Sequence, residues 1–147
     1  MVAVSEDNNF VFKNICGGVK LQMKGTQRIA SIMLQGNSSE KIAGEAVVVV
    51  YPDNSAPTAK MAMGATTSIT LNCGTDGVQL NENGAMEFIL TMPPVVFDKG
   101  FTVNITDTDG NVYTVDTDKA NTVLRSTLLV MPAFTLGEPL PGNETDV

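Results

Sequence analysis

Short runs of alternating apolar and polar residues dominate this chain, and turn residues interrupt them about every 8 to 12 positions. Phe10 and Phe12 alternate in this way, as do Val19 to Met23 after the pair Gly17-Gly18, and Ile32 to Leu34. A period of two gives each strand one apolar face. No segment combines the apolar spacing of a helix with a cap and a glycine stop. The sequence therefore predicts an all-β protein.

Many short strands in one body favour a two-sheet β-sandwich of Greek-key type, because a single sheet of that size needs a cover for its apolar face. Four consecutive valines within Glu45 to Tyr51 predict a strand that is central or buried on both faces. The clearest hairpin joins Phe101 to Ile105 with Val112 to Thr117 through the turn at Asp109-Gly110. Val123 to Met131 is expected to be the last strand. The pair Gly17-Gly18 predicts a bulge or a close backbone approach.

The chain has 147 residues, which suits one domain with one core. We expect a disordered N-terminal arm over residues 1–8, the sandwich over 9–135, and a Pro/Gly-rich acidic tail or linker over 136–147.

The formal net charge is −7, and the basic residues are scattered. This charge argues against nucleic acid or an anionic membrane as partner. No apolar run reaches the length of about 18 residues needed for a transmembrane helix. Met1 to Asn9 does not have the pattern of a signal peptide. Abundant Asn, Thr, Ser and Gly, few Lys and Arg, and cysteines without metal-site spacing nevertheless favour an exported protein.

Histidine is absent from the sequence, which removes the usual general base and zinc ligand, and we expect neither catalysis nor a cofactor. Acidic residues are densest around one predicted turn, where Asp107, Asp109 and Asn111 resemble the start of a calcium loop. No glutamate stands at the twelfth position of that loop to give the bidentate ligand. A solvated hairpin turn is therefore favoured over a calcium site.

The two cysteines, Cys16 and Cys73, both precede a glycine and a strand-like run. A disulfide between them would stabilise the fold by roughly 4 kcal/mol through loop closure. Two buried thiols that act as small apolar side chains are the alternative. The sequence leaves both states open, since it does not reveal the separation of the two Cα atoms.

Several strand and turn phrases together resemble the N-terminal domain of the fimbrillin-like surface proteins of Bacteroidetes, within the pilin superfamily. The phrases that carry this resemblance lie between Asn9 and Phe134: Phe12-Lys-Asn-Ile-Cys-Gly-Gly-Val-Lys-Leu21, Lys24-Gly-Thr26, Gln79-Leu-Asn81, Met92-Pro-Pro94, Lys99-Gly-Phe-Thr-Val103, Asp107-Thr-Asp-Gly110 and Leu124 to Pro132. The resemblance implies a transthyretin-like sandwich that is exported as a lipoprotein to the outer membrane or a fimbrium.

The resemblance further implies a structural or adhesive role as a pilus subunit or accessory subunit, with other pilin or surface-protein subunits as partners. Such pilins assemble by β-strand addition after a protease, often arginine-specific, removes an N-terminal strand. Arg28 is the only arginine in the early part of this chain. The alternative is a module that binds glycans or other ligands of a host or bacterial surface. Tyr51 and Tyr113 are the only tyrosines and tryptophan is absent, so few aromatic platforms exist for a sugar.

Overall fold

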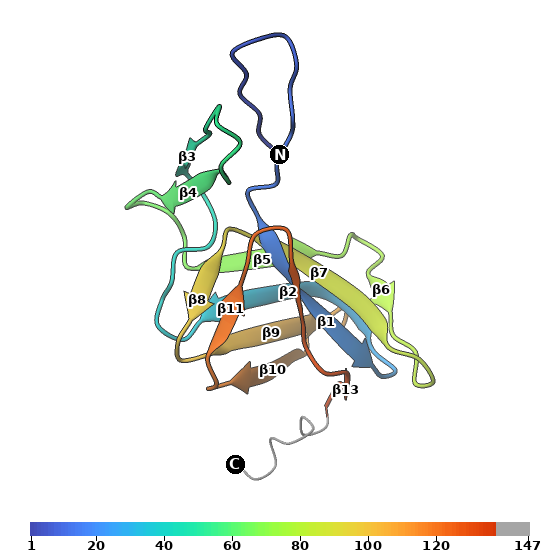
Figure 1. Ribbon diagram of the computed structural model, residues 1–147. Helices are drawn as coiled ribbons and strands as arrows, with labels where there is room; N and C mark the ends of the chain where they lie inside the picture. The colour runs from blue at the N-terminus through green and yellow to red at the C-terminus, as the bar shows by residue number, and fades with distance from the viewer. Residues whose placement is uncertain (138–147) are drawn as a thin grey trace.

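The structure is a computed structural model that describes residues 1–137. Every regular element in this range is a β-strand, and most of them form two layers that face each other (Figure 1). The predicted all-β, sandwich-like architecture is therefore confirmed. Its finer assignment to the transthyretin-like, Greek-key type stays a prediction.

The first layer is built around β1 (Gly17–Lys24). On one side of β1 lies the antiparallel strand β7 (Met86–Met92). On the other side β12 (Leu128–Val130) and then β13 (Phe134–Thr135) run parallel to it. Segments from the beginning, middle and end of the described chain thus meet in one sheet.

The second layer is antiparallel throughout. Its strands follow the order β10-β9-β2-β5, with β6 also beside β2. The bounds of these strands are β2 Arg28–Gly36, β5 Ser68–Asn72, β6 Val78–Gln79, β9 Phe101–Asp107 and β10 Val112–Thr117. The predicted hairpin between β9 and β10 is present, and Gly110 in its turn has a φ of 89°.

Two short pairs complete the fold. β8 (Val95–Phe97) pairs with β11 (Asn121–Val123), and β3 (Ala46–Val49) pairs with β4 (Thr58–Met61). Neither pair joins a larger sheet in the described part of the chain.

The core lies between the two layers because each strand turns every second side chain inward. In β9, for example, the residues from Phe101 to Asp107 alternate between buried and half-buried. Phe97 and Phe101 pack edge to face, with ring centroids 5.5 Å apart. Each fully buried large side chain contributes about 1.5–3 kcal/mol relative to an exposed one. The largest of them are Phe97, Met23, Ile29, Ile32, Leu34, Ile42, Met92 and Ile105.

The glycine pair at the start of β1 permits a close backbone approach, as predicted. A Cβ on Gly17 would overlap the carbonyl oxygen of Leu124, and a Cβ on Gly18 would lie 2.9 Å from the carbonyl oxygen of Leu90. Because these two residues lack side chains, the start of β1 lies close to β7 and to the turn between β11 and β12.

Three strand predictions are wrong. The valine run is not central, because β3 lies in the small pair with β4 and exposes Val47 and Val49. The last predicted strand is two strands, β11 and β12, separated by a turn in which Ser126 has a φ of 59°. Phe10 and Phe12 alternate as in a strand, yet they lie in an exposed loop.

Of the two predicted terminal segments, the N-terminal arm lies wholly within the described residues and the C-terminal tail only in part. The N-terminal arm belongs to a loop, residues 2–13, whose ends are joined by two backbone hydrogen bonds of 2.8 Å between Val2 and Lys13. At the other end Leu136 is buried, and its N–H donates to the carbonyl of Lys24. The rest of the predicted tail, residues 138–147, lies outside the described residues.

Candidate interaction surface

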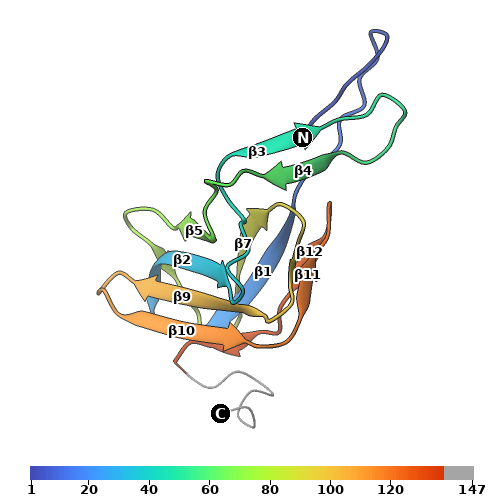
Figure 2. The ribbon, with the colours of Figure 1, turned by 90° about the vertical axis from the view of Figure 1, so that its left-hand side faces the viewer.

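The hairpin of β3 and β4 projects from one end of the sandwich, and the N-terminal loop lies beside it (Figures 1 and 2). We call residues 1–14 and 45–62 together the apical lobe. No side chain of β3 or β4 belongs to the buried core. The lobe is therefore held outside the sandwich by the segments that connect it.

Local chemistry explains why this segment forms a hairpin. Valine is a strong strand former, and the run from Ala46 to Val50 contains no helix-promoting or turn residue after its first position. The chain then reverses through Pro52, Asp53 and Asn54, where Asn54 has a φ of 73°. The Asp53 carboxylate accepts a hydrogen bond from the N–H of Ser55 at 3.1 Å. Hydrogen bonds from Ser55 lower the pKa of Asp53, so the charged form favours the turn.

One face of this hairpin is open to solvent, and on it Val47 and Val49 lie opposite Lys60 and Thr58 of β4. Val47 exposes 64% of its surface and Val49 43%. Single exposed valines are common, but neighbouring ones on an uncovered strand pair are a feature of interaction sites. An isolated two-stranded hairpin is also only marginally stable in water, so a partner that packed on this exposed face would stabilise it.

The outer edges of the hairpin lack strand partners. Within residues 1–137, β3 pairs only with β4 and β4 only with β3. The Glu45 carbonyl accepts a hydrogen bond from Ala62 N–H, so the backbone groups of Glu45 face β4. In an antiparallel ladder this direction alternates from residue to residue, and the N–H and C=O of Val48 therefore face away from β4 at the outer edge. Such groups are a template for another strand.

The N-terminal loop adds further apolar surface to the lobe. Phe10, Val11 and Phe12 each expose more than half of their surface, at 58%, 65% and 64%. The Lys13 ammonium donates a hydrogen bond of 2.6 Å to the Asn54 side chain, which ties the loop to the tip of the hairpin. Two segments that are far apart in the sequence thus form one surface.

A cleft of about 260 Å³ opens between the loop and the hairpin tip. Its lining mixes one aromatic ring with polar and charged groups: Tyr51, Asp7, Asn9, Lys13 and Asn54. Tyr51 exposes 39% of its surface. The Asp7 carboxylate accepts hydrogen bonds from Ser5 Oγ and Asn9 N–H, which lower its pKa. A ring beside convergent polar groups is an arrangement that can bind a sugar.

The acidic turn that resembles a calcium loop lies far from this lobe in sequence and organises itself around Asp107. Asp107 exposes 5% of its surface, and its carboxylate accepts from the N–H groups of Asp109 and Asn111, from Asn111 Nδ2 and from Tyr113 Oη at 2.9–3.2 Å. Burial raises its pKa, but these hydrogen bonds outweigh burial and the pKa is lowered.

The protein's own donors thus occupy both carboxylate oxygens of Asp107, and Asp109 contributes only its backbone N–H to this network. Across residues 1–137 no group of three or more His, Cys, Asp or Glu side chains could hold a metal ion. The arrangement is that of a hairpin turn closed by a carboxylate.

The two cysteines are free thiols that lie on different layers. Cys16 precedes β1 in the first layer, and Cys73 follows β5 in the second. Cys73 packs against the core, and burial raises the pKa of its thiol. Both side chains are half-buried, so the two thiols are unbonded in this structure without being the fully buried pair of the alternative.

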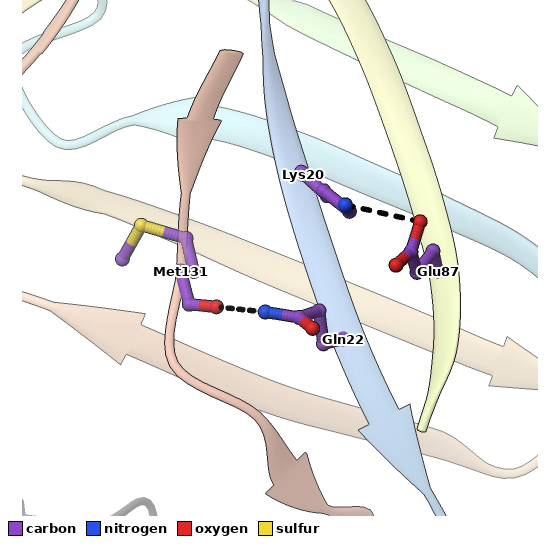
Figure 3. A network of polar contacts seen from close by, with 4 residues as sticks. All are labelled: Lys20, Gln22, Glu87 and Met131. Carbon is purple, nitrogen blue, oxygen red and sulfur yellow. Dashed lines mark hydrogen bonds and ion pairs between the residues drawn. The ribbon is translucent and has the colours of Figure 1, made fainter. Parts of the chain in front are cut away.

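The outer face of the first layer combines polar contacts with exposed apolar side chains, since Ile89 on β7 and Val130 on β12 flank Lys20 and are 44% and 54% exposed. Lys20 on β1 forms an ion pair of 3.0 Å with Glu87 on β7, and Gln22 Nε2 donates to the carbonyl of Met131 at 3.0 Å (Figure 3). These contacts connect β1 to its neighbours on both sides.

Residues 1–137 contain no helix that is long and apolar enough to cross a membrane. Compared with known proteins, the chain matches no family model, no curated protein and no solved structure. The fimbrillin-like assignment therefore stays a resemblance, and the function must be argued from the surface described above.

Proposed function

We propose that this chain is a non-catalytic structural or adhesive domain of a cell surface, a pilus subunit or accessory subunit that assembles through β-strand pairing. Its partners are other pilin or surface-protein subunits. The observation that carries the proposal is the β3–β4 hairpin, which exposes valines and has no strand partner at its outer edges within residues 1–137.

The chemistry of the chain supports a role without catalysis. The sequence has no histidine, and the most buried carboxylate among residues 1–137, that of Asp107, accepts hydrogen bonds within the turn between β9 and β10. Backbone groups at an open edge supply the affinity in β-strand addition, while alternate side chains supply register. The apical lobe has both features.

Export to the outer surface is part of this proposal. It rests on the polar, lysine-poor composition and on the fimbrillin-like phrases. A test is to probe intact and lysed cells of the source organism with an antibody against the chain. We expect labelling of intact cells and recovery in high-mass assemblies at the surface. Labelling only after lysis would overturn the proposal.

The assembly step has its own variant. Val48→Pro removes an N–H that points to the outer edge of β3 and leaves the hydrogen bonds to β4 in place. We expect this variant to reach the surface and to be lost from the assemblies. Val112→Pro is the matched control, since Val112 is an exposed valine on β10, an edge strand of the second layer, and its N–H points away from β9.

A second function, glycan binding, is favoured by one observation, the cleft that contains Tyr51. A sugar ring would lie against the tyrosine and bond with Lys13 and Asn54 at the tip of the hairpin. Binding of the chain to an array of oligosaccharides tests this function. Tyr51→Ala should weaken binding several-fold, because an aromatic contact contributes about 0.5–1.5 kcal/mol. Equal binding by both proteins, or no binding by either, would exclude the cleft as a sugar site.

A further inference from the structure

The connection between β6 and β7 contains the pair Asn83-Gly84, which is the only Asn-Gly pair in the sequence. Asparagine is among the thermolabile residues of proteins. The backbone nitrogen of the next residue can attack its side-chain carbonyl carbon, and a glycine at that position hinders this approach least because it has no Cβ. The surroundings of the pair decide whether this reaction can occur in the folded protein.

The pair lies in a short loop that is held at both ends and open between them. Before the pair, the Asn81 carbonyl accepts a hydrogen bond of 3.2 Å from Gly25 N–H. After it, Met86 is paired with Met23 of β1. Residues 82–85, between these contacts, are all exposed. The loop lies at the C-terminal end of β1, away from the apical lobe (Figure 1).

Both reacting groups are free in this loop. Within residues 1–137 the Gly84 N–H donates no hydrogen bond, and the Asn83 side chain makes none. Beyond the two neighbouring residues, no atom lies within 4 Å of the position that a Cβ of Gly84 would take. The Asn83 N–H donates a hydrogen bond of 2.8 Å to the Asn81 side chain, and this contact leaves the Asn83 side chain itself unrestrained.

From this geometry we propose that Asn83 is a site of spontaneous deamidation, with water as the co-reactant. The Gly84 nitrogen forms a bond to Cγ of Asn83 and gives up its proton, while the Asn83 side-chain nitrogen takes up a proton and leaves as ammonia. Water then opens the cyclic succinimide at either of its two carbonyl groups, which yields aspartate or isoaspartate at position 83. No group is oxidised or reduced. Either product adds one negative charge to the net charge of −7.

The two Asp-Gly pairs of the chain can form the same succinimide with loss of water, but the structure restrains their glycine nitrogens. Gly110 N–H donates to the carbonyl of Asp107 at 3.1 Å, and Gly77 N–H donates to the carbonyl of Gly74 at 3.3 Å. A nitrogen must lose this proton in order to attack, so a hydrogen bond that holds the proton opposes the reaction. We therefore expect the Asn-Gly pair to change first.

The fold should tolerate both products. Isoaspartate adds a methylene group to the backbone, which would disturb the register of a paired strand. Residues 82–85 pair with no strand in the described part of the chain. Leu80, which is buried before the loop, and Met86, which begins β7, can keep their places. The modification thus changes the charge of the folded protein at the end away from the apical lobe, and it is independent of the proposed function.

Incubation of the purified, folded chain at pH 8 tests the proposal. Glu82 and Glu87 flank the site, so cleavage after glutamate in mild acid isolates residues 83–87 from every other asparagine. This peptide should gain the mass difference between OH and NH₂ and separate by chromatography into two isomers. The reaction should accelerate as the pH of the incubation is raised, because the attacking nitrogen must be deprotonated. Circular dichroism should not change as the products accumulate.

Two variants provide controls. Gly84→Ala has room for its Cβ and should fold as the unchanged chain does, but it should react more slowly because the methyl group hinders attack. Asn83→Gln should lose the modification at this site, since the longer side chain would have to close a larger ring.

A denatured sample of the unchanged chain shows whether the fold protects the pair. A peptide 83–87 that keeps its mass in the folded protein and changes in the denatured one would overturn the inference. Equal rates in Gly84→Ala and the unchanged chain would also overturn it, as would earlier modification at another asparagine. Modification of the folded protein at Asn83 first, slowed by Gly84→Ala, is the result that we expect.

Discussion

Asp107 is the residue whose protonation matters most for the turn between β9 and β10. Its folded pKa lies below the unfolded value of roughly 4, so its carboxylate stabilises the fold above that pH. This contribution is lost as the pH falls through the folded pKa. We expect Asp107→Asn to lower the melting temperature at pH 7, because the amide brings an N–H donor toward existing donors. The difference from the unchanged protein should shrink below about pH 4.

Thermal unfolding followed by circular dichroism from pH 7 to pH 2 measures this effect. Asp109→Asn is the control, since Asp109 gives only its backbone N–H to the network. A difference that stays constant across the whole pH range would mean that the charge of Asp107 is not what stabilises the turn.

The free thiols lead to a second prediction. Burial raises the pKa of Cys73, and the thiolate is the reactive form. In the Cys16→Ala variant, iodoacetamide at pH 8 should therefore modify Cys73 more slowly in the folded than in the denatured protein. Mass spectrometry of the unchanged, unreduced protein should show two thiols. A mass lower by two hydrogens would instead reveal a disulfide between Cys16 and Cys73.

Among the strands, those defined by local signals were predictable from the sequence. The hairpin of β9 and β10 follows from alternation and from Asp109-Gly110, because a tight turn sets the register of the strands that it joins. The break between β11 and β12 was missed because Ser126 adopts a positive φ without a glycine or proline to mark it.

The apical lobe could not be predicted because it depends on contacts between distant segments. The valines of β3 have the composition of a buried strand, and composition alone does not say which segment lies beside them. The cleft depends on Lys13 and Asn54, which are 41 positions apart. Within the lobe, the turn residues Pro52 to Asn54 are the ones that carry a local signal in the sequence.

The hairpin of β3 and β4 should also be the first strand pair to open. It buries little apolar surface, and amide exchange through local opening is fast where few buried contacts hold the backbone. In dilute protein we expect its amides to exchange at least a hundredfold faster than those of β1 and β2. Hydrogen exchange with mass spectrometry measures both rates. Equal protection in all of these strands would show that the hairpin is covered.

In the molecule as a whole, the residues that stabilise the fold are separate from those that we propose bind a partner. The core between the two layers holds the fold, while the valines of β3 are presented outside it. Substituting both Val47 and Val49 by Thr should change the free energy of unfolding by less than about 1 kcal/mol, since surface substitutions are usually small and Thr keeps the strand preference. Leu34→Ala, at a fully buried site, should cost about 2–5 kcal/mol.

Denaturant unfolding of dilute protein measures both free energies, and recovery in surface assemblies of the source organism measures the association of the same variants. The valine variant should fold like the unchanged chain and be lost from these assemblies, because Thr replaces the apolar side chains beside the β3 edge with polar ones. Leu34→Ala should still enter the assemblies wherever it remains folded. A valine variant that unfolds as readily as Leu34→Ala would mean that the lobe is part of the core, and its exposure could then no longer be interpreted as a site for a partner.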